Sequence, residues 1–394
     1  MSGAAAIFLL STCTADPLEW DIKTIASGER NGSIAAISTT KLVLGNSQEI
    51  ESGEWYAVQR RGTSIPDYPK VSHVELVNGD RIIGKITDCD GTTLHIIPAF
   101  AAPAAAIQVP MSGIRVVWIT RQSDPAPYWL TQARKRDVFQ LRSGDVVLGA
   151  IDRFDTATNL LRYQSDGKSQ QLDWSSISAI GMNTDLARIR KPKGSYFRVI
   201  FRNGSRLSVP SIAFDGTQWT VQTTSKESLQ FPAEFVVSVD VEQGKAAHLS
   251  DLRPSNYQYQ TFDGEEHTWH SNTNVLGGPL RLSVGESEST FDRGVGLHAS
   301  CSITYKLEDQ YRRFEALVGL DAQVGATGNA ELDILVDGRS VPLPAGGKLL
   351  GNGPVRTLAI DVLNGKELTI IIRSGVGGNV CDRVNLADAR LISK

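Results

Sequence analysis

The sequence predicts an all-β protein, in which a tandem of small N-terminal β-barrels precedes a C-terminal jelly-roll β-sandwich. Three observations support this fold class. Apolar residues occur in short runs that alternate with polar residues, as in half-buried strands. The chain has 36 glycines and 16 prolines, which is typical of a protein with many turns. A strand–turn–strand pattern also recurs through the N-terminal half.

Four copies of one unit account for the N-terminal half. Each copy begins with a strand that leads through a glycine-centred turn into a second strand. Glycine in such a turn takes a positive φ without steric cost. We expect about five strands per copy, bent into a barrel whose strand rhythm is similar to that of SH3-like and Sm-like barrels. The copies are Ile22–Leu44, which is the weakest, His73–Ile97, Val138–Tyr163 and Phe197–Gln222; the turns of the last three are Asn78-Gly79, Ser143-Gly144 and Asn203-Gly204.

The domain boundaries are expected to follow these copies. With 394 residues, the chain is long enough for several domains. The repeats are assigned to residues 16–66, 67–130, 131–190 and 191–247, and the sandwich to residues 248–394. Within the sandwich we expect strands at Gln258–Phe262, Leu280–Leu282, Gly296–Ala299, Ser302–Leu307, Arg313–Gly319, Ala330–Val336, Val355–Asp361, Glu367–Arg373 and Val384–Leu391.

The C-terminal segment carries an ordered set of short motifs. They are Gly277-Gly278-Pro279-Leu280, the Gly-x-Gly-x-His run of Gly294, Gly296 and His298, Tyr311-Arg312-Arg313-Phe314, Gly319-Leu320-Asp321, Val336-Asp337-Gly338 and Ala387-Asp388-Ala389-Arg390-Leu391. With these motifs, the segment from about Leu249 to Ile392 resembles the NPCBM family of carbohydrate-binding modules. The resemblance implies a galactose-binding-like β-sandwich that binds glycan.

Sugar recognition requires an aromatic face for stacking and planar polar side chains that bind hydroxyl groups. The resemblance therefore suggests a binding site at a loop end of the sandwich. Its candidate residues are Trp269, His298, Asp382, Arg383 and Asn385. For His298 a structural role is the alternative, in which a half-buried ring bonds to the closing strand.

The closing segment departs from the family pattern at three positions. Arg383 replaces the usual His, Asn385 replaces the second Asp, and Leu386 replaces a Trp. If the Trp position belongs to the core, the domain has repacked around a smaller side chain. If the position faces the ligand, binding is weakened or altered.

Two further expectations come from the resemblance and the implied fold. Related modules often hold a structural calcium ion, so Asp321 and Asp388 are candidate ligands, although calcium needs six or more oxygens. Cys301 and Cys381 lie near the two ends of the domain, where jelly-roll strands often pair. A disulfide between them would close a long loop and add about 4 kcal/mol of stability; the alternative is two free buried thiols.

The sequence contains no motif of a known catalytic centre. It lacks GxSxG, a P-loop and HExxH, so we expect a protein that is not an enzyme. His267 and His270 have no third ligand nearby, and a solvated loop is the more ordinary explanation. Trp118, Trp174 and Trp219 fit barrel core better than a binding platform. The net charge of −3 gives no reason to expect a nucleic-acid partner.

The N-terminus predicts export. Ala4 to Leu10 resembles the apolar region of a signal peptide, which we assign to residues 1–15, although the usual positive charges before it are missing. No other apolar run is long enough for a transmembrane helix. We therefore expect an extracytoplasmic protein that is secreted, periplasmic or at the cell surface.

The leading functional hypothesis is a non-catalytic protein that binds glycan or attaches to a cell surface or matrix, where other surface proteins are further partners. The alternative is a structural or protein–protein adaptor that has lost sugar binding, as the Leu386 departure suggests. An accessory protein of a glycoside hydrolase, or a hydrolase with a site at a domain junction, has less support, because the sequence offers no catalytic domain of the needed size.

Overall fold

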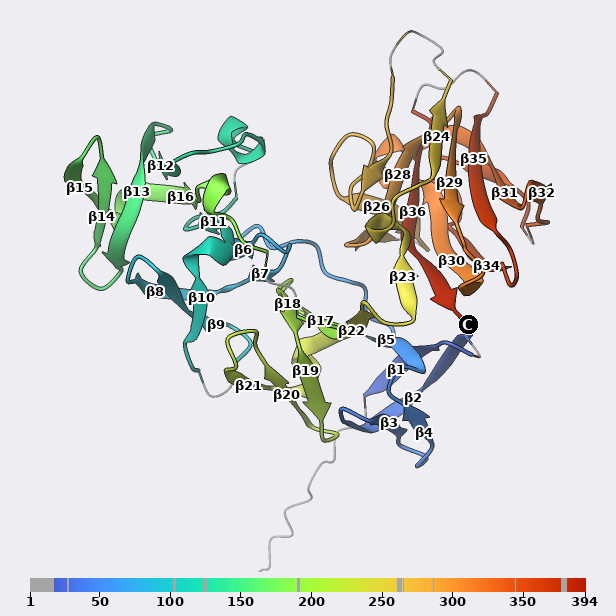
Figure 1. The fold of residues 1–394 in the computed structure, drawn as a ribbon, viewed down its shortest axis with the longest axis horizontal. Helices are drawn as coiled ribbons and strands as arrows, with labels where there is room; N and C mark the ends of the chain where they lie inside the picture. Colours follow the sequence, from blue (N-terminus) through green and yellow to red (C-terminus); the bar gives the residue numbers. More distant parts are fainter. Residues whose placement is uncertain are drawn as a thin grey trace, which may run out of the picture.

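The computed structural model describes residues 18–26, 28–101, 104–122, 126–189, 192–260, 264, 266–285, 287–343, 345–376 and 381–394. The predicted signal peptide, residues 1–15, lies outside these ranges. The described residues form β-strands and seven short 3₁₀ turns, with no α-helix among them, which confirms the all-β prediction (Figure 1). Within those ranges no helix is long and apolar enough to cross a membrane.

The strands of the N-terminal half are grouped here by the four predicted repeats. Repeat 1 contains β1 (Glu19–Thr24), β2 (Gly28–Ile37), β3 (Lys41–Leu44), β4 (Glu49–Glu51) and β5 (Trp55–Arg60). Repeat 2 contains β6 (His73–Leu76), β7 (Arg81–Ile82), β8 (Gly84–Cys89), β9 (Thr93–Pro98), β10 (Ile107–Pro110), η1 (Met111–Gly113) and β11 (Ile114–Trp118). Repeat 3 contains η2 (Tyr128–Thr131), β12 (Asp137–Leu141), β13 (Val146–Asp155), β14 (Leu160–Ser165), β15 (Lys168–Asp173), η3 (Trp174–Ser176), β16 (Ile177–Gly181) and η4 (Thr184–Leu186). Repeat 4 contains β17 (Tyr196–Phe201), β18 (Arg206–Val209), β19 (Ser211–Phe214), β20 (Gln218–Gln222), β21 (Ser228–Pro232), η5 (Ala233–Phe235) and β22 (Val236–Glu242).

In repeats 2, 3 and 4 the predicted glycine turn joins the first strand to the second. Gly79, Gly144 and Gly204 have φ of +89°, +95° and +90°, which confirms the turn prediction. The last strand of each repeat then returns to pair with its first strand: β5 with β1, β11 with β6, β16 with β12 and β22 with β17.

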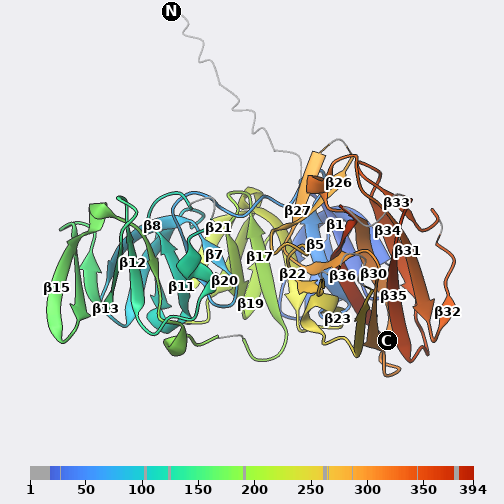
Figure 2. The same cartoon turned by 90° about the horizontal axis from the view of Figure 1, so that it is seen from above.

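The repeats are not separate units, because their strands also pair with one another. β5 of repeat 1 pairs with β22 of repeat 4, β11 of repeat 2 pairs with β16 of repeat 3, and β7 of repeat 2 pairs with β18 of repeat 4. All 22 strands therefore form one hydrogen-bonded set, and the repeats lie in the spatial order 3–2–4–1 (Figure 2). One apolar core runs through all four repeats and includes Trp20, Ile96, Phe139 and Phe231. Trp118 and Trp219 are buried, as expected for core, and Trp174 packs at the edge of this core.

The C-terminal part is a sandwich of two antiparallel sheets. Its elements are β23 (Ala246–His248), η6 (Leu249–Asp251), β24 (Asn256–Tyr259), β25 (His270–Ser271), β26 (Leu280–Val284), β27 (Ser287–Phe291), β28 (Gly294–His298), β29 (Cys301–Lys306), β30 (Tyr311–Leu320), η7 (Ala322–Val324), β31 (Asn329–Val336), β32 (Arg339–Ser340), β33 (Lys348–Leu350), β34 (Arg356–Asp361), β35 (Glu367–Ser374) and β36 (Arg383–Ser393). One sheet has the order β25-β28-β36-β30-β34, with β23 also on β36. The other has the order β24-β29-β35-β31-β32, with β33 also on β31. The β26–β27 hairpin forms a separate two-stranded sheet.

Alternation of buried and exposed side chains along β29 and β35 places one face of each strand in the core between the sheets. Ile303, Phe314, Ile370 and Leu391 are among the buried residues of this core. Each such side chain contributes about 1.5–3 kcal/mol through burial of apolar surface.

The sandwich lies on repeats 1 and 4, at the opposite end of the molecule from repeat 3 (Figures 1 and 2). A small apolar cluster spans this junction and contains Ile25, Tyr56 and Ala57 of repeat 1 with Ala246 and Ile392 of the sandwich. The Tyr56 hydroxyl also donates a hydrogen bond to Glu315. The two parts are therefore in direct contact over both apolar and polar surface.

Candidate functional site

The loop end of the sandwich that lies away from the repeats brings together several of the predicted residues. β28 ends at His298 and β36 begins at Arg383, and these two residues are opposite one another in the sheet. Asp382 precedes Arg383, and its carbonyl accepts a hydrogen bond from the Ala299 amide at 2.9 Å. Trp269 precedes β25, whose His270 pairs with Gly296 of β28. Four of the five predicted ligand residues are therefore neighbours at one end of one sheet.

His298 belongs to a cluster of three rings. Its imidazole stacks on that of His267, with ring centroids 4.2 Å apart and planes at 13°. The ring of Tyr259 meets the His267 ring edge-on at 5.4 Å. The carbonyl of His267 accepts a hydrogen bond from the Tyr257 hydroxyl at 2.8 Å, which fixes the loop beneath the ring. Tyr259, His267 and the nearby Trp269 are each half-buried, so part of each ring faces solvent.

The environment of His298 is that of a neutral ring. The side chain is 8% exposed, and Nδ1 lies 3.2 Å from the Ala299 carbonyl oxygen. Burial lowers the pKa of His298 below its usual value, and a charge on His267 would lower it further, although the Ala299 carbonyl acts in the opposite direction. The ring therefore serves mainly to support His267, and its Nδ1 contacts the carbonyl of the neighbouring Ala299, where the structural alternative expected a bond to the closing strand.

Asp382 is an internal residue rather than a surface one. It is 1% exposed, and its Oδ1 accepts a hydrogen bond from the Asn329 amide at 2.8 Å. Its Oδ2 has no hydrogen-bond partner among the described residues. Burial raises the pKa of Asp382, with hydrogen bonds from backbone amides opposing the shift. Asp382 thus anchors the loop before β31, while the neighbouring Arg383 remains half-exposed.

Asn385 and Asp321 form a separate buried polar cluster under the β26–β27 hairpin. Asn385 Nδ2 donates to Asp321 Oδ2 at 3.2 Å and to the Arg281 carbonyl at 3.0 Å. Asn274 Nδ2 donates to the same Asp321 oxygen at 2.8 Å. Asp321 Oδ1 accepts from the Gln323 amide at 2.9 Å and so caps η7. Asn385 therefore ties β36 to the hairpin and is buried too deeply to contact a ligand.

The Asn385→Asp substitution tests this cluster. It would replace the donor beside Asp321 with a third acceptor, so we expect the free energy of unfolding to fall by about 1–3 kcal/mol at pH 7. The penalty should shrink as the pH falls, since protonation of the introduced carboxyl restores a donor. Chemical denaturation at pH 7 and pH 4 measures both effects. Asn364→Asp, in an exposed turn, is the matched control, and an equal loss in both variants would contradict the role assigned to Asn385.

The two expected calcium ligands do not share a site. Asp321 already accepts hydrogen bonds from two side-chain amides and one backbone amide. Asp388 forms ion pairs with Arg390 at 2.6 Å and with Lys23 of repeat 1 at 3.2 Å. The described residues contain no group of three or more His, Cys, Asp or Glu placed to hold a metal ion. Asp321 and Asp388 therefore do not fit a common calcium site, and Asp388 forms the structural pair with Arg390.

The predicted disulfide is wrong, because Cys301 and Cys381 are both free thiols. Cys301 lies on β29 and packs into the core between the sheets. Cys381 lies in the turn before β36, with φ of +66°. Burial raises the pKa of the Cys301 thiol to about 12, which makes that thiol unreactive.

Leu386 resolves the alternative left open by the missing Trp. It is fully buried in the sandwich core, opposite Val295 of β28 and Val318 of β30. The departure from the family pattern therefore affects core packing and leaves the solvent-facing rings at the loop end intact.

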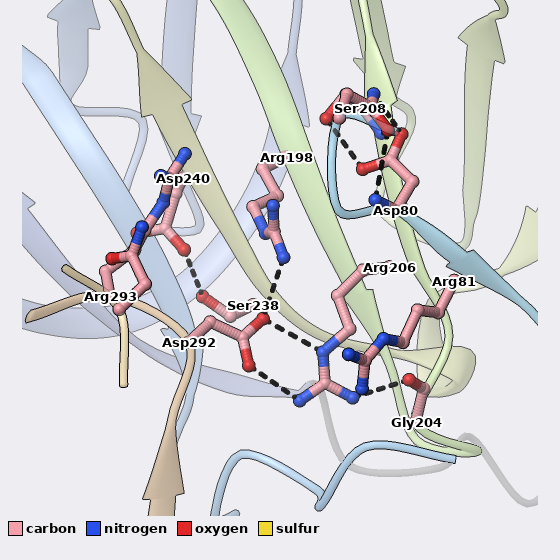
Figure 3. Close-up of polar contacts among 12 residues, drawn as sticks. Asp80, Arg81, Arg198, Gly204, Arg206, Ser208, Ser238, Asp240, Asp292 and Arg293 are labelled. Atoms are coloured by element: carbon pink, nitrogen blue, oxygen red, sulfur yellow. Dashed lines mark hydrogen bonds and ion pairs between the residues drawn. The ribbon is translucent and has the colours of Figure 1, made fainter. Parts of the chain in front are cut away.

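A polar cluster that the sequence did not predict joins the sandwich to the repeats. Asp292 follows β27 and inserts its carboxylate between two arginines of repeat 4 (Figure 3). Arg206 binds both carboxylate oxygens, with Nε–Oδ2 of 2.9 Å and Nη2–Oδ1 of 3.0 Å. Arg198 Nη2 lies 3.0 Å from Oδ2. All three side chains are at least nine-tenths buried. Asp292 lies two residues before Gly294 of the Gly-x-Gly-x-His run, but no local pattern in the sequence identifies its partners.

The second ion-pair group of the junction surrounds Arg390 of β36. Its Nη2 lies 2.7 Å from Asp240 of repeat 4 and 2.6 Å from Asp388. Asp388 has φ of +49° at a bulge, where β36 has one extra residue relative to β30. The bulge points the carboxylate at Lys23, so a single acid contacts both parts of the molecule.

The C-terminal part matches a known protein family. Residues 245–392 match the family model described as the NPCBM/NEW2 domain. The C-terminal part of the chain is an NPCBM/NEW2 domain. This confirms the resemblance drawn from the motifs. The SH3-like or Sm-like resemblance of the repeats stays a prediction. A search of curated proteins finds no match for the chain.

Several solved structures are similar to parts of this chain. One is a CBM51 from Clostridium perfringens GH95 in complex with methyl-galactose, with 21% identity and a TM-score of 0.34, covering 37% of this chain and 99% of that chain. Another contains CBM51-2, in complex with GlcNAc, and INT domains from Clostridium perfringens ZmpB, with 23% identity and a TM-score of 0.35, covering 45% of this chain and 36% of that chain. A third contains the tandem CBM51 modules of Sp3GH98 from Streptococcus pneumoniae SP3-BS71, with 12% identity and a TM-score of 0.34, covering 65% of this chain and 88% of that chain. At these values the neighbours support no ligand or binding residue for this chain.

Proposed function

We propose that this chain is a non-catalytic protein that binds glycan, and that the glycan binds at the loop end of the NPCBM/NEW2 domain. The observation that carries the proposal is the pair of partly exposed rings of Tyr259 and His267 at the end of the sheet where Arg383 pairs with His298, together with the half-buried Trp269 two residues after His267. Aromatic faces stack on the apolar face of a pyranose, and a guanidinium forks onto its hydroxyl groups. The family match of residues 245–392 supports the same class of ligand.

The residues predicted from the sequence divide into two roles under this proposal. Trp269 and Arg383 contact the sugar, because each has surface that solvent reaches. His298 and Asp382 are buried and position those contacts from below, whereas Asn385 is buried in the separate cluster under the β26–β27 hairpin. A single shallow site leaves much of a glycan hydrated, so we expect modest affinity that depends on avidity.

We also propose that the protein acts outside the cytoplasm, attached to or near a cell surface or matrix. The apolar N-terminal run and the carbohydrate-binding class of the domain support this location. The repeats then serve as a spacer that holds the NPCBM/NEW2 domain and presents its loop end to solvent (Figure 1).

Trp269→Ala in the full-length chain tests the proposed site. A glycan array identifies a retained sugar, and isothermal titration calorimetry then measures its affinity for wild type and variant. We expect the affinity to fall about tenfold, because a lost stacking contact is worth about 1.5 kcal/mol. Arg383→Ala should also lower the affinity for the same sugar.

Two matched substitutions control for indirect effects. Trp174→Ala removes a half-buried Trp from repeat 3, and Arg373→Ala removes an exposed Arg from β35 of the same sandwich. Both should leave the affinity unchanged. A sugar that binds Trp269→Ala and wild type equally would place the site elsewhere, and a chain that retains no glycan on the array would favour the adaptor alternative.

A further inference from the structure

Repeats 2 and 4 contact each other through the same part of each repeat. Arg81 begins the second strand of repeat 2, Arg206 begins the second strand of repeat 4, and these two residues pair across the boundary. Both residues occupy the second position after the turn glycine, Gly79 or Gly204. An antiparallel contact in which equivalent residues face one another has local two-fold symmetry.

The hydrogen bonds at this boundary obey the same symmetry. Ser208 donates from its amide and its hydroxyl to the Asp80 carboxylate, each at 2.8 Å. The Ile83 amide donates in turn to the Ser205 hydroxyl at 3.0 Å. Asp80 and Ser205 each directly follow the turn glycine, and Ile83 and Ser208 each lie three residues further along. Each repeat thus offers an acceptor directly after the turn glycine and an outward-pointing amide three residues later. The amide of each repeat donates to the acceptor of the other.

In repeat 3 the equivalent strand edge runs from Asp145, directly before β13, to Leu148. No strand of another repeat pairs with this edge among the described residues. Asp145 follows Gly144 and is exposed, and Leu148 lies three residues beyond it. The Leu141 amide bonds to the Asp145 carbonyl, and Val147 then faces Phe139 within the repeat. By strand alternation, the amides of Val146 and Leu148 point away from β12, as those of Ile83 and Ser208 do at the covered boundary. The Leu148 side chain is 48% exposed, which is unusual for a leucine in the middle of a strand.

In repeat 1 the equivalent strand edge faces the sandwich. The start of its second strand, at Gly28 and Glu29, lies in a cleft against the sandwich together with Arg313 and Glu315. Repeats 2 and 4 cover each other, and repeat 1 faces the sandwich. Repeat 3 lies at the free end of the array (Figure 2).

We propose that repeat 3 binds repeat 3 of a second copy of this chain through this edge, with the two-fold geometry that joins repeats 2 and 4. Val146 faces Val146 of the second copy, and the Leu148 amide donates to Asp145 of the second copy, in both directions. The surface fits a second copy because its donor and its acceptor are self-complementary. An open strand edge with outward amides is also the part of a sheet most ready to pair.

Such a dimer would extend the array to eight repeats with one NPCBM/NEW2 domain at each distant end. The domain lies on repeats 1 and 4, so dimerisation through repeat 3 leaves its loop end uncovered (Figures 1 and 2). Two weak glycan sites on one rigid body would then act together on a surface rich in glycan. Dimerisation itself does not depend on the proposed glycan binding, and its test needs no sugar.

Sedimentation equilibrium of the full-length chain from about 1 to 200 μM tests the proposal. We expect the average mass to rise from monomer toward dimer, and Leu148→Glu to weaken the dimer at least about tenfold, because the two-fold register places each new carboxylate beside Asp145 of the second copy, as the Ser208 side chain lies beside Asp80. Leu350→Glu, at a leucine that is 49% exposed on β33, should leave the dimer unchanged. A monomer at every concentration, or a dimer insensitive to Leu148→Glu, would overturn the proposal.

Cross-linking gives an independent readout of the register. Residues that face one another across an antiparallel pair have Cα atoms about 4.5–5.5 Å apart, which suits a disulfide. Val146→Cys should therefore form a disulfide-linked dimer under mild oxidation at low micromolar concentration, while wild type and Leu350→Cys should not. Equal cross-linking of Val146→Cys and Leu350→Cys would contradict the two-fold register.

Discussion

Asp292→Ala is expected to lower the free energy of unfolding of the full-length chain by about 3–5 kcal/mol. The wild-type carboxylate neutralises two buried guanidiniums of repeat 4, whose side chains are 0% exposed for Arg206 and 8% exposed for Arg198. Arg206 would keep carbonyl partners at Pro66 and Asp67. Arg198 would lose the ion pair, and breaking one partner out of a buried pair leaves a charge without compensation.

Chemical denaturation of wild type and variant measures this loss, and Asp292→Asn separates charge from volume. Asp333→Ala is the matched control, because its ion pair with Arg373 at 3.1 Å is largely in solvent and contributes about 0–1 kcal/mol. We also expect the repeats and the NPCBM/NEW2 domain of Asp292→Ala to unfold in separate transitions. Equal stability losses for Asp292→Ala and Asp333→Ala would show that the buried position of Asp292 adds nothing.

The junction between the two parts should also be the first region to weaken in acid. Burial by itself would raise the pKa of Asp292, but Arg206 and Arg198 outweigh it and hold the pKa below its usual value. The pKa of Asp388 is likewise lowered, because Arg390 and Lys23 outweigh the effect of burial. When the pKa of a carboxyl is lower in the folded state than in the unfolded state, that carboxyl stabilises the protein at any pH above its unfolded-state pKa. The stabilisation is lost as the pH falls toward the folded-state pKa.

The loss should therefore begin below about pH 5 and grow at about 1.4 kcal/mol per pH unit for each carboxyl. Glu242 opposes the trend, since burial raises its pKa despite the ion pair with Arg293. Thermal unfolding between pH 7 and pH 3 measures the slope. The slope should be smaller in Asp292→Asn, which has no carboxyl there to protonate. An identical pH dependence in wild type and Asp292→Asn would contradict the assignment.

The parts of the fold that short-range sequence patterns encode were predicted well. The turns at Gly79, Gly144 and Gly204 follow from a local need for positive φ. The burial of Trp118 and Trp219 follows from apolar content at strand ends. The NPCBM/NEW2 assignment follows from ordered motifs whose spacing is itself a sequence property.

The candidate site was predicted less completely. Trp269, His298, Asp382 and Arg383 lie at one loop end of the sandwich, and their role as ligand contacts stays a prediction. Sequence types did not reveal which of them are buried, and Asn385 and Asp382 are internal. The stacking of His267 on His298 also depends on a loop that folds back over β28, which no periodic pattern specifies.

The all-β class and the NPCBM/NEW2 domain can be read from the amino-acid sequence, because they depend on residue type and on spacing along the chain. The common core of the N-terminal strands, the separation of Cys301 from Cys381 and the junction at Asp292 arise only when the strands pack together. Asp292 lies 86 and 94 residues from its arginine partners in the chain. Charges that attract at 3 Å in a low-dielectric interior leave no local pattern in the sequence, so their pairing appears only when the strands that carry them have packed.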